Sequence, residues 1–278
     1  MIELECAGYI DRQKIRSWIL INPGSQFSVP ALGSVRLSTF VVLMAPRVGS
    51  CILALFLFVT NSVISRAMST PLAKVLNDLA AANKLPSVIV FDLDNTLWTP
   101  ELYQLYKTPI ANRNIELFPG ALEVLQCLHE LQATSSSCPL LAIASRATEN
   151  DWAQSLLDQF PIAGAGTANA VRMRQLFRDD LIYIECRSKR WHFREIQSAC
   201  GNVPFSEMVF FDDDMYLNLD EISGIGVLSC HTPRGLTVDL FRETMIKYSE
   251  LRDNQDAEMG QILDARNLGL TTTTRKKK

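Results

Sequence analysis

The chain has 278 residues, 47% hydrophobic and 21% charged, a composition that suffices for one large domain or for one medium domain with extensions. It excludes a chain disordered throughout, a collagen-like fibre and a protein with many membrane spans. With 27 Lys and Arg against 30 Asp and Glu, the net charge is −3, so the global basic field needed for non-specific nucleic-acid binding is absent and we expect no nucleic-acid partner.

The cysteines indicate an intracellular protein. There are seven, an odd number, and they are scattered along the chain and never spaced as Cys-x-x-Cys. Such a pattern fits neither a secreted disulfide framework nor a structural zinc site. We therefore expect reduced thiols and a cytoplasmic location.

Residues 1–67 form a leader that lacks helical or strand periodicity until a dense apolar run at 48–64. The run is shorter than the ~20 residues that a spanning helix needs. Three interpretations stay open: a membrane-anchoring signal, an organellar transit peptide suggested by the early basic residues, and a dispensable extension before a natural start at Met68. We place the folded domain at residues 68–250 and a polar, basic tail at 251–278.

Regular patterns begin near Pro71, and residues 73–83 have the apolar spacing of an amphipathic helix. Three short runs rich in β-branched, aliphatic and aromatic residues predict strands that are buried on both faces of a parallel sheet, and helical patterns separate them. The predicted strands are 87–91, 140–144 and 208–211, and the predicted helices are 119–131, 148–160 and 192–200. Alternating strands and helices predict an α/β fold, a doubly wound, Rossmann-like parallel sheet with helices on both faces.

Polar side chains follow each predicted strand at the point where it ends. Asp92 and Asp94 follow the first strand, Ser145 and Arg146 the second, and three consecutive aspartates at 212–214 the third. Each group alone also fits a turn or a helix cap. Because ligands bind at the carboxyl ends of the strands in an open α/β sheet, the three groups together favour one shared site. Crowded carboxylates need a cation, and an all-oxygen set indicates a hard metal such as magnesium.

These residues resemble the motifs of the haloacid dehalogenase (HAD) superfamily over about residues 86–241. The Leu-Trp pair after the first motif, the Ala-Ser-Arg of the second and the Phe-Phe-Asp-Asp of the fourth are most similar to its magnesium-dependent phosphatase branch. The segments that carry the resemblance are, in motif order, 91–98, 144–146, Lys189 and 210–213. The resemblance implies a HAD-like fold and a magnesium-dependent phosphatase.

The sequence departs from the family pattern at a few positions. The segment before Lys189 lacks the Pro-Gly that often precedes the Ser-Lys of the third motif, so Lys107 and Arg187 remain alternatives for its cation. Asn95 stands where Tyr is frequent in this branch, and Asp214 stands where Glu is common. Neither of these last two changes removes a catalytic carboxylate.

The resemblance also implies roles for the acidic residues. Asp92 would be the nucleophile that forms an aspartyl-phosphate, and Asp94 would be the general acid and then the general base. Magnesium would be held by a side-chain oxygen of Asp92, the backbone carbonyl of Asp94, and Asp212 or Asp213.

The remaining site residues would bind the phosphoryl group. Lys189 would neutralise negative charge, and Ser145 would hold phosphoryl oxygens together with the backbone around Leu93 and Arg146. The gaps after the first and second motifs are too short for a cap domain, so the resemblance implies an open site.

We therefore expect a monomeric phosphomonoesterase that acts on a phosphoprotein side chain of the phosphotyrosine type or on a small sugar phosphate. Trp98, Tyr103 and Tyr106 would either stack on the substrate at the rim or pack the loop that carries them. Two other classes stay open: a HAD-type phosphotransferase or phosphomutase would use the same Asp92, and a non-catalytic binding protein of this fold would be expected to lack Asp92 or Asp94.

Overall fold

A six-stranded parallel sheet forms the centre of the fold, which a computed structural model describes for residues 70–167, 170–254 and 257–270, all within one unit spanning residues 63–278. The predicted leader, including the apolar run at 48–64, lies outside the described residues. In spatial order the strands are β10 (Ile262–Leu263), β9 (Leu228–His231), β8 (Met208–Asp212), β1 (Val88–Phe91), β4 (Leu140–Ser145) and β7 (Ile182–Ile184).

The strands of this sheet are buried because apolar side chains cover both of its faces. Successive side chains of a strand point to opposite faces. In β1, Ile89 and Phe91 therefore join the larger of two apolar cores, and Val88 and Val90 join the smaller one. β4 and β8 pair with β1 in parallel and divide their side chains in the same way. Burial on both faces explains why these strands read as continuous apolar runs.

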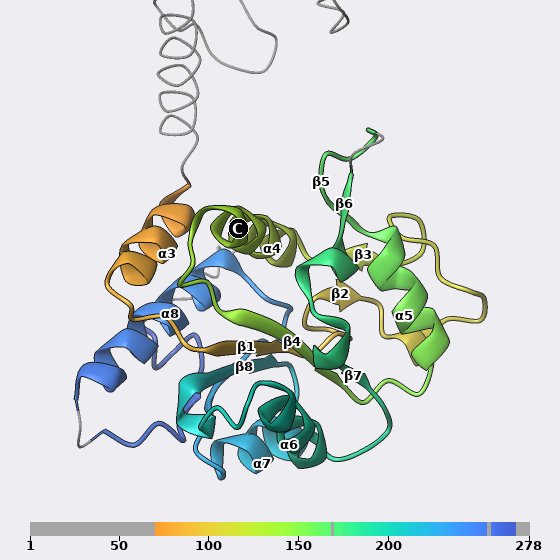
Figure 1. The fold of residues 1–278 in the computed structure, drawn as a ribbon. Helices are drawn as coiled ribbons and strands as arrows, with labels where there is room; N and C mark the ends of the chain where they lie inside the picture. The colour runs from red at the N-terminus through yellow and green to blue at the C-terminus, as the bar shows by residue number, and fades with distance from the viewer. Residues whose placement is uncertain (1–69, 168–169, 255–256, 271–278) are drawn as a thin grey trace, which may run out of the picture. The chain divides into compact units, whose positions relative to one another are not determined.

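Helices cover both faces of the sheet (Figure 1). The larger core is closed by α3 (Pro71–Ala81), α4 (Pro119–Thr134), α5 (Asn150–Gln159) and α8 (Val238–Asp253), and the smaller core by α6 (Lys189–Ala199) and α7 (Asp220–Ser223). Local sequence sets where these helices begin. Thr70 caps α3 before Pro71, and Ser188 caps α6 by accepting a hydrogen bond from the Trp191 amide at 3.2 Å.

The doubly wound α/β fold is confirmed, and the described connections carry no cap domain. Between β1 and α4 the chain forms a two-stranded antiparallel sheet from β2 (Trp98–Thr99) and β3 (Glu116–Leu117). Between α5 and β7 it forms a second one from β5 (Pro161–Ala163) and β6 (Val171–Arg172). In the described part of the chain, each of these two segments thus holds only small secondary elements.

The domain extends further toward the C-terminus than the boundary at residue 250. Helix α8 ends at Asp253, and residues 262–263, which we assigned to a polar tail, form the edge strand β10 paired in parallel with β9. β10 has two residues and β9 contains Ser229 and His231, so neither shows the continuous apolar run that reveals a central strand.

Across the described ranges, no helix is both long and apolar enough to cross a membrane. The five cysteines in the described residues are all free thiols, as the scattered spacing predicts.

Candidate active site

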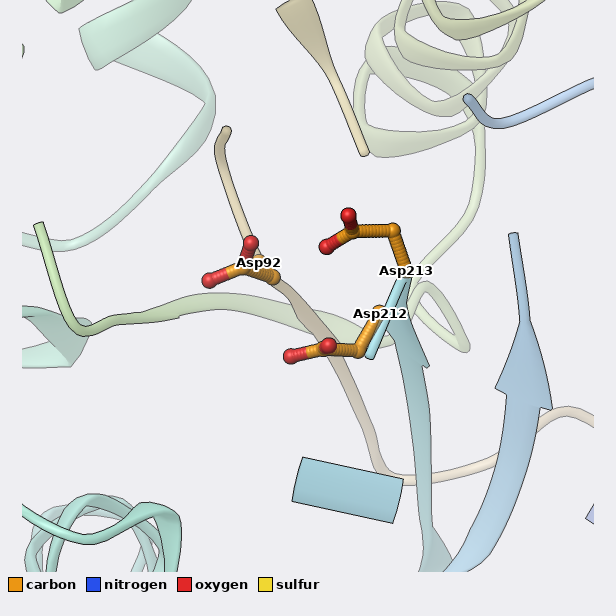
Figure 2. Close-up of side chains that lie close together, drawn as sticks. All are labelled: Asp92, Asp212 and Asp213. Carbon is orange, nitrogen blue, oxygen red and sulfur yellow. The ribbon is translucent and has the colours of Figure 1, made fainter. Parts of the chain in front are cut away.

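The central acidic cluster lies where β1 and β8 end side by side. Phe91 and Phe211 are partners in the sheet, and the Asp92 amide continues the pairing by donating to the Phe211 carbonyl at 2.9 Å. Asp92 and Asp212 therefore emerge together at the carboxyl edge. Each of Asp92, Asp212 and Asp213 offers one carboxylate oxygen, and these oxygens lie within 4.8 Å of one another (Figure 2). The oxygens are close enough together to coordinate one divalent cation.

Lys189, the first residue of α6, contacts this cluster although it lies 97 positions after Asp92 in the sequence. Its Nζ lies 2.6 Å from Asp92 Oδ1 and 2.9 Å from Asp212 Oδ2, and it also donates to the backbone carbonyl of Ala144. The ammonium group is fully buried and sits 5.2 Å from the centre of the Phe210 ring. All three of its donors have partners, which satisfies the requirement for burying a charge.

The charges in this cluster do not balance. Burial raises the pKa of Asp92 although Lys189 opposes that effect. Burial alone would lower the pKa of Lys189, but the carboxylates of Asp212 and Asp92 raise it above its ordinary value. Burial, with Asp212 next to it, raises the pKa of Asp213 to about 6. One ammonium facing three carboxylates leaves excess negative charge, so the donor set fits a hard divalent cation bound by oxygen.

Asp94 follows Asp92 by two residues and is held by a separate set of donors. The indole Nε1 of Trp98 donates to Asp94 Oδ1 at 2.6 Å, and the Leu102 amide donates to the same oxygen at 3.3 Å. Burial raises the pKa of Asp94 to about 6 although both hydrogen bonds act in the opposite direction. A carboxyl group with such a pKa can both donate and accept a proton near neutral pH.

The second predicted motif lies at the end of β4, next to β1. Ser145 is buried, and its hydroxyl accepts a hydrogen bond from the Ala147 amide at 3.3 Å, so it acts locally as a turn cap. Arg146 is exposed and donates from Nη1 to Asn218 Oδ1 at 3.2 Å. Leu93 is buried, and its carbonyl accepts from the amides of residues 96–98, which closes the turn after Asp92.

Asn218 is a site residue that the sequence analysis missed. Its Nδ2 donates to both oxygens of Asp212, at 3.0 and 3.1 Å, while its Oδ1 accepts from Arg146. It lies in a π-helical segment, Met215–Leu219, which Asp214 caps through the amides of residues 216 and 217. The wider π-helical turn breaks the ordinary spacing, so a search at helical periods does not find Asn218.

Hydrogen bonding distinguishes Asp212 from Asp213, the two aspartates of the fourth motif. Asp212 accepts from Lys189, Asn218 and the Asp214 amide, so both of its oxygens already have donors. The Asp213 side chain receives a hydrogen bond from Asn95, and its backbone carbonyl is 3.0 Å from His231 Nε2. Asp213 thus has more free capacity to coordinate a cation.

The structure also decides which of Lys189, Lys107 and Arg187 is the cation next to Asp92. Arg187 pairs with Glu185 at 3.1 Å and lies 4.6 Å above the Trp191 ring, and Lys107 is exposed. Within the described residues, Lys189 is thus the lysine or arginine that contacts Asp92.

The rim aromatics behave differently from one another. Trp98 is fully buried, so stacking on a substrate is excluded for it, whereas Tyr103 and Tyr106 are exposed, the latter completely. The sequence could not distinguish Trp98 from the two tyrosines, because Trp98 is buried against a residue distant in the chain. Its ring stacks on Phe160, 62 positions later, with 5.9 Å between the ring centroids.

A protein-family model described as Acid Phosphatase matches residues 84–251, which include every residue of this site. The chain belongs to the acid phosphatase family. It is 29% identical over 178 residues to magnesium-dependent phosphatase 1 of Homo sapiens, a match that covers 60% of this chain and 89% of the human protein. These matches confirm the resemblance stated above and the enzyme class, a phosphatase.

A solved structure is also similar: the N-terminal part of a Bacteroides fragilis protein, which contains a phosphatase domain and was solved in complex with Mg. The match has 16% sequence identity and a TM-score of 0.38, and it covers 66% of this chain and 43% of that one.

Proposed function

We propose that this phosphatase is a magnesium-dependent phosphomonoesterase that forms an aspartyl-phosphate on Asp92. The observation that carries the proposal is that the Asp92 carboxylate lies beside both the Lys189 ammonium, at 2.6 Å, and the carboxylates of Asp212 and Asp213. The Asp92 carboxylate stands at the end of a buried strand, next to the buried Lys189 ammonium and to carboxylate oxygens that can coordinate a metal ion. Such a carboxylate is suited to attack a phosphate dianion.

The residues assigned to magnesium are Asp92, Asp213 and the backbone carbonyl of Asp94, with Asp212 beside them. Bound there, the ion would offset the repulsion between the Asp92 carboxylate and the phosphate dianion. Lys189 contributes a second positive charge at Asp92 Oδ1. Ser145 and Arg146, on the neighbouring strand end, are assigned to the phosphoryl oxygens together with the backbone at Leu93.

The reaction then needs one group that handles protons. In the first step a carboxylate oxygen of Asp92 forms a bond to phosphorus, the bond from phosphorus to the ester oxygen breaks, and Asp94 gives its proton to that oxygen. In the second step a water oxygen forms a bond to phosphorus, Asp94 takes a proton from the water, and the bond from phosphorus to the Asp92 oxygen breaks. Inorganic phosphate leaves and the Asp92 carboxylate is restored. A pKa of about 6 for Asp94 supports both directions of transfer.

The substrate class that we propose is a phosphate ester on a phosphotyrosine-type side chain or on a small sugar. Support comes from the connections around the site, which in the described residues hold only short two-stranded sheets, and from the exposed Tyr103 and Tyr106 on one of them. An open rim with exposed aromatic rings admits an aryl phosphate on a protein surface as well as a small ligand.

Asp92→Asn and Asp94→Asn test the mechanism because the two roles differ. Asp92→Asn should abolish both turnover and the trapped aspartyl-phosphate, since an amide is a poor nucleophile. Asp94→Asn should lower kcat/KM by about 10²- to 10⁴-fold for an alkyl phosphate and by much less for nitrophenyl phosphate, whose leaving group needs little protonation. Each variant is assayed with and without Mg²⁺, and the products are analysed for transfer to acceptors other than water.

Asp158→Asn serves as a matched control, since it makes the same change at an exposed carboxylate that pairs with Arg174 rather than with the cluster. Magnesium-dependent turnover by Asp92→Asn, or equal losses for both variants on every leaving group, would contradict the proposed mechanism.

A further inference from the structure

Trp98 occupies an unusual place for a tryptophan so close to a catalytic carboxyl group. The whole side chain is buried, and its ring stacks on Phe160 with 5.9 Å between centroids and 25° between planes. Its backbone is held in β2 by pairing with Leu117 in β3. A ring fixed by both packing and strand pairing directs its one polar atom, the indole nitrogen, in a single direction.

That nitrogen points to Asp94. The indole N–H donates to Oδ1 at 2.6 Å, and the Leu102 amide donates to the same oxygen at 3.3 Å. Both groups are obligate donors that cannot accept a hydrogen bond. Oδ1 is thus engaged by two donors, and among the described residues no hydrogen bond ends on Oδ2.

We infer that Trp98 is a positioning residue that presents Oδ2 of Asp94 to the leaving group. The inference rests on the proposed function, because it assigns one orientation to the general acid of that reaction. A proton on Oδ1 would point at two N–H groups, so the carboxylic acid carries its proton on Oδ2 and gives it to the ester oxygen as the phosphorus–oxygen bond breaks. The negative charge left on Asp94 is then stabilised by the two N–H donors on Oδ1.

The second half of the reaction uses the same orientation. Oδ2, with no other partner among the described residues, takes the proton from the attacking water and restores the acid. Free rotation of the carboxyl group would lose this direction in both steps, and small misplacements of a proton donor carry large rate penalties. Trp98 thereby acts on the reaction through Asp94 and is not a group that touches the substrate.

Trp98→Phe tests this inference because it keeps an aromatic ring against Phe160 and removes only the donor and part of the ring. The assay measures kcat/KM, which reports the step in which the leaving group departs, for a series of esters from nitrophenyl phosphate through phenyl phosphate to an alkyl phosphate. We expect about a 10- to 100-fold loss for the alkyl ester and less than about 3-fold for nitrophenyl phosphate. In an Asp94→Asn background, Trp98→Phe should add no further dependence on the leaving group.

Trp152→Phe is the matched control, since it makes the same change at a partly buried tryptophan in α5, and among the described residues the hydrogen bonds to the Asp94 carboxylate come from Trp98 and Leu102. A loss that is equal across all esters would mean that Trp98 serves packing alone, and no loss at all would mean that the Leu102 amide suffices; either result overturns the inference. Failure of the proposed function would show itself separately, as turnover by Asp92→Asn.

A measurement on the wild-type ring covers the case in which Trp98→Phe does not fold. The Trp98 indole resonance in a ¹H–¹⁵N spectrum should shift clearly upon Asp94→Ala and should not shift upon Asp158→Ala, a change at an exposed carboxylate. An indole resonance that ignores Asp94→Ala would show that the hydrogen bond does not exist in solution, and the inference would fall.

Discussion

Lys189→Met removes the buried cation of the site while keeping a side chain of similar length. The substitution leaves the carboxylates of Asp92 and Asp212 without the ammonium that lies 2.6 and 2.9 Å from them, and leaves the Ala144 carbonyl without its donor. Removing one partner of a buried ion pair costs about 3–5 kcal/mol because the other charge stays buried without compensation. For a domain of this size each kcal/mol shifts Tm by roughly 2–4 °C, so we expect a loss of about 6–20 °C.

The assay is unfolding by heat and by urea without Mg²⁺, with Lys84→Met as the control. Lys84 pairs with Asp253 at the surface, where the two side chains are 39% and 56% exposed, and such a pair contributes about 0–1 kcal/mol. Added Mg²⁺ should raise the Tm of Lys189→Met more than that of the wild type, because the variant leaves more negative charge uncompensated at the cation site.

A double-mutant cycle with Asp92→Asn separates the ion pair from general packing. If Lys189 compensates Asp92, the free energy of unfolding lost in the double variant should be smaller than the sum of the single losses by about 0.5–3 kcal/mol. Additive losses, or a Lys189→Met variant as stable as Lys84→Met, would refute the reasoning that the buried ammonium balances the carboxylates.

Two further predictions concern stability. Gly120→Ala should destabilise the protein by about 1–3 kcal/mol, because an added Cβ would lie 2.6 Å from the Leu236 carbonyl oxygen and 2.7 Å from Thr237 Cα, both backbone atoms. The measurement is urea unfolding. Gly224→Ala, the same change at a helix end with φ −62°, is the control and should stay within about 1 kcal/mol of the wild type. Burial, aided by the charge of Lys189, lowers the pKa of His192 to about 4 in the folded protein. As the pH drops below 6.5, the imidazole of the unfolded chain is protonated before that of the folded protein, so protonation favours unfolding. The free energy of unfolding should therefore fall between pH 6.5 and pH 4, by about 3 kcal/mol in total. Urea unfolding of the wild type and His192→Gln across that window checks it, and identical pH slopes for the two proteins would contradict the assignment.

The apolar runs of the sequence determined the central strands and the edge at which the site forms. β1, β4 and β8 are buried on both faces, so nearly every residue in them must be apolar, and this need is visible without any knowledge of their partners. Parallel pairing then brings the carboxyl ends of these strands to one edge, which is why the sequence could predict that Asp92, Ser145 and Asp212 lie at that edge. The motif resemblance added their proposed roles.

The tertiary structure decided the features that depend on contacts between distant residues. Lys189 and Asp92 meet across 97 positions, and only the packing of α6 against the sheet buries that ammonium and excludes Lys107 and Arg187. Trp98, expected at the rim, is a buried hydrogen-bond donor that packs against Phe160. Asn218 contacts Asp212 from within a π-helical turn. The edge strand β10 holds its place by pairing with β9. Local sequence encodes how apolar a segment must be, whereas the partners of a buried polar group are set by the chain's long-range path.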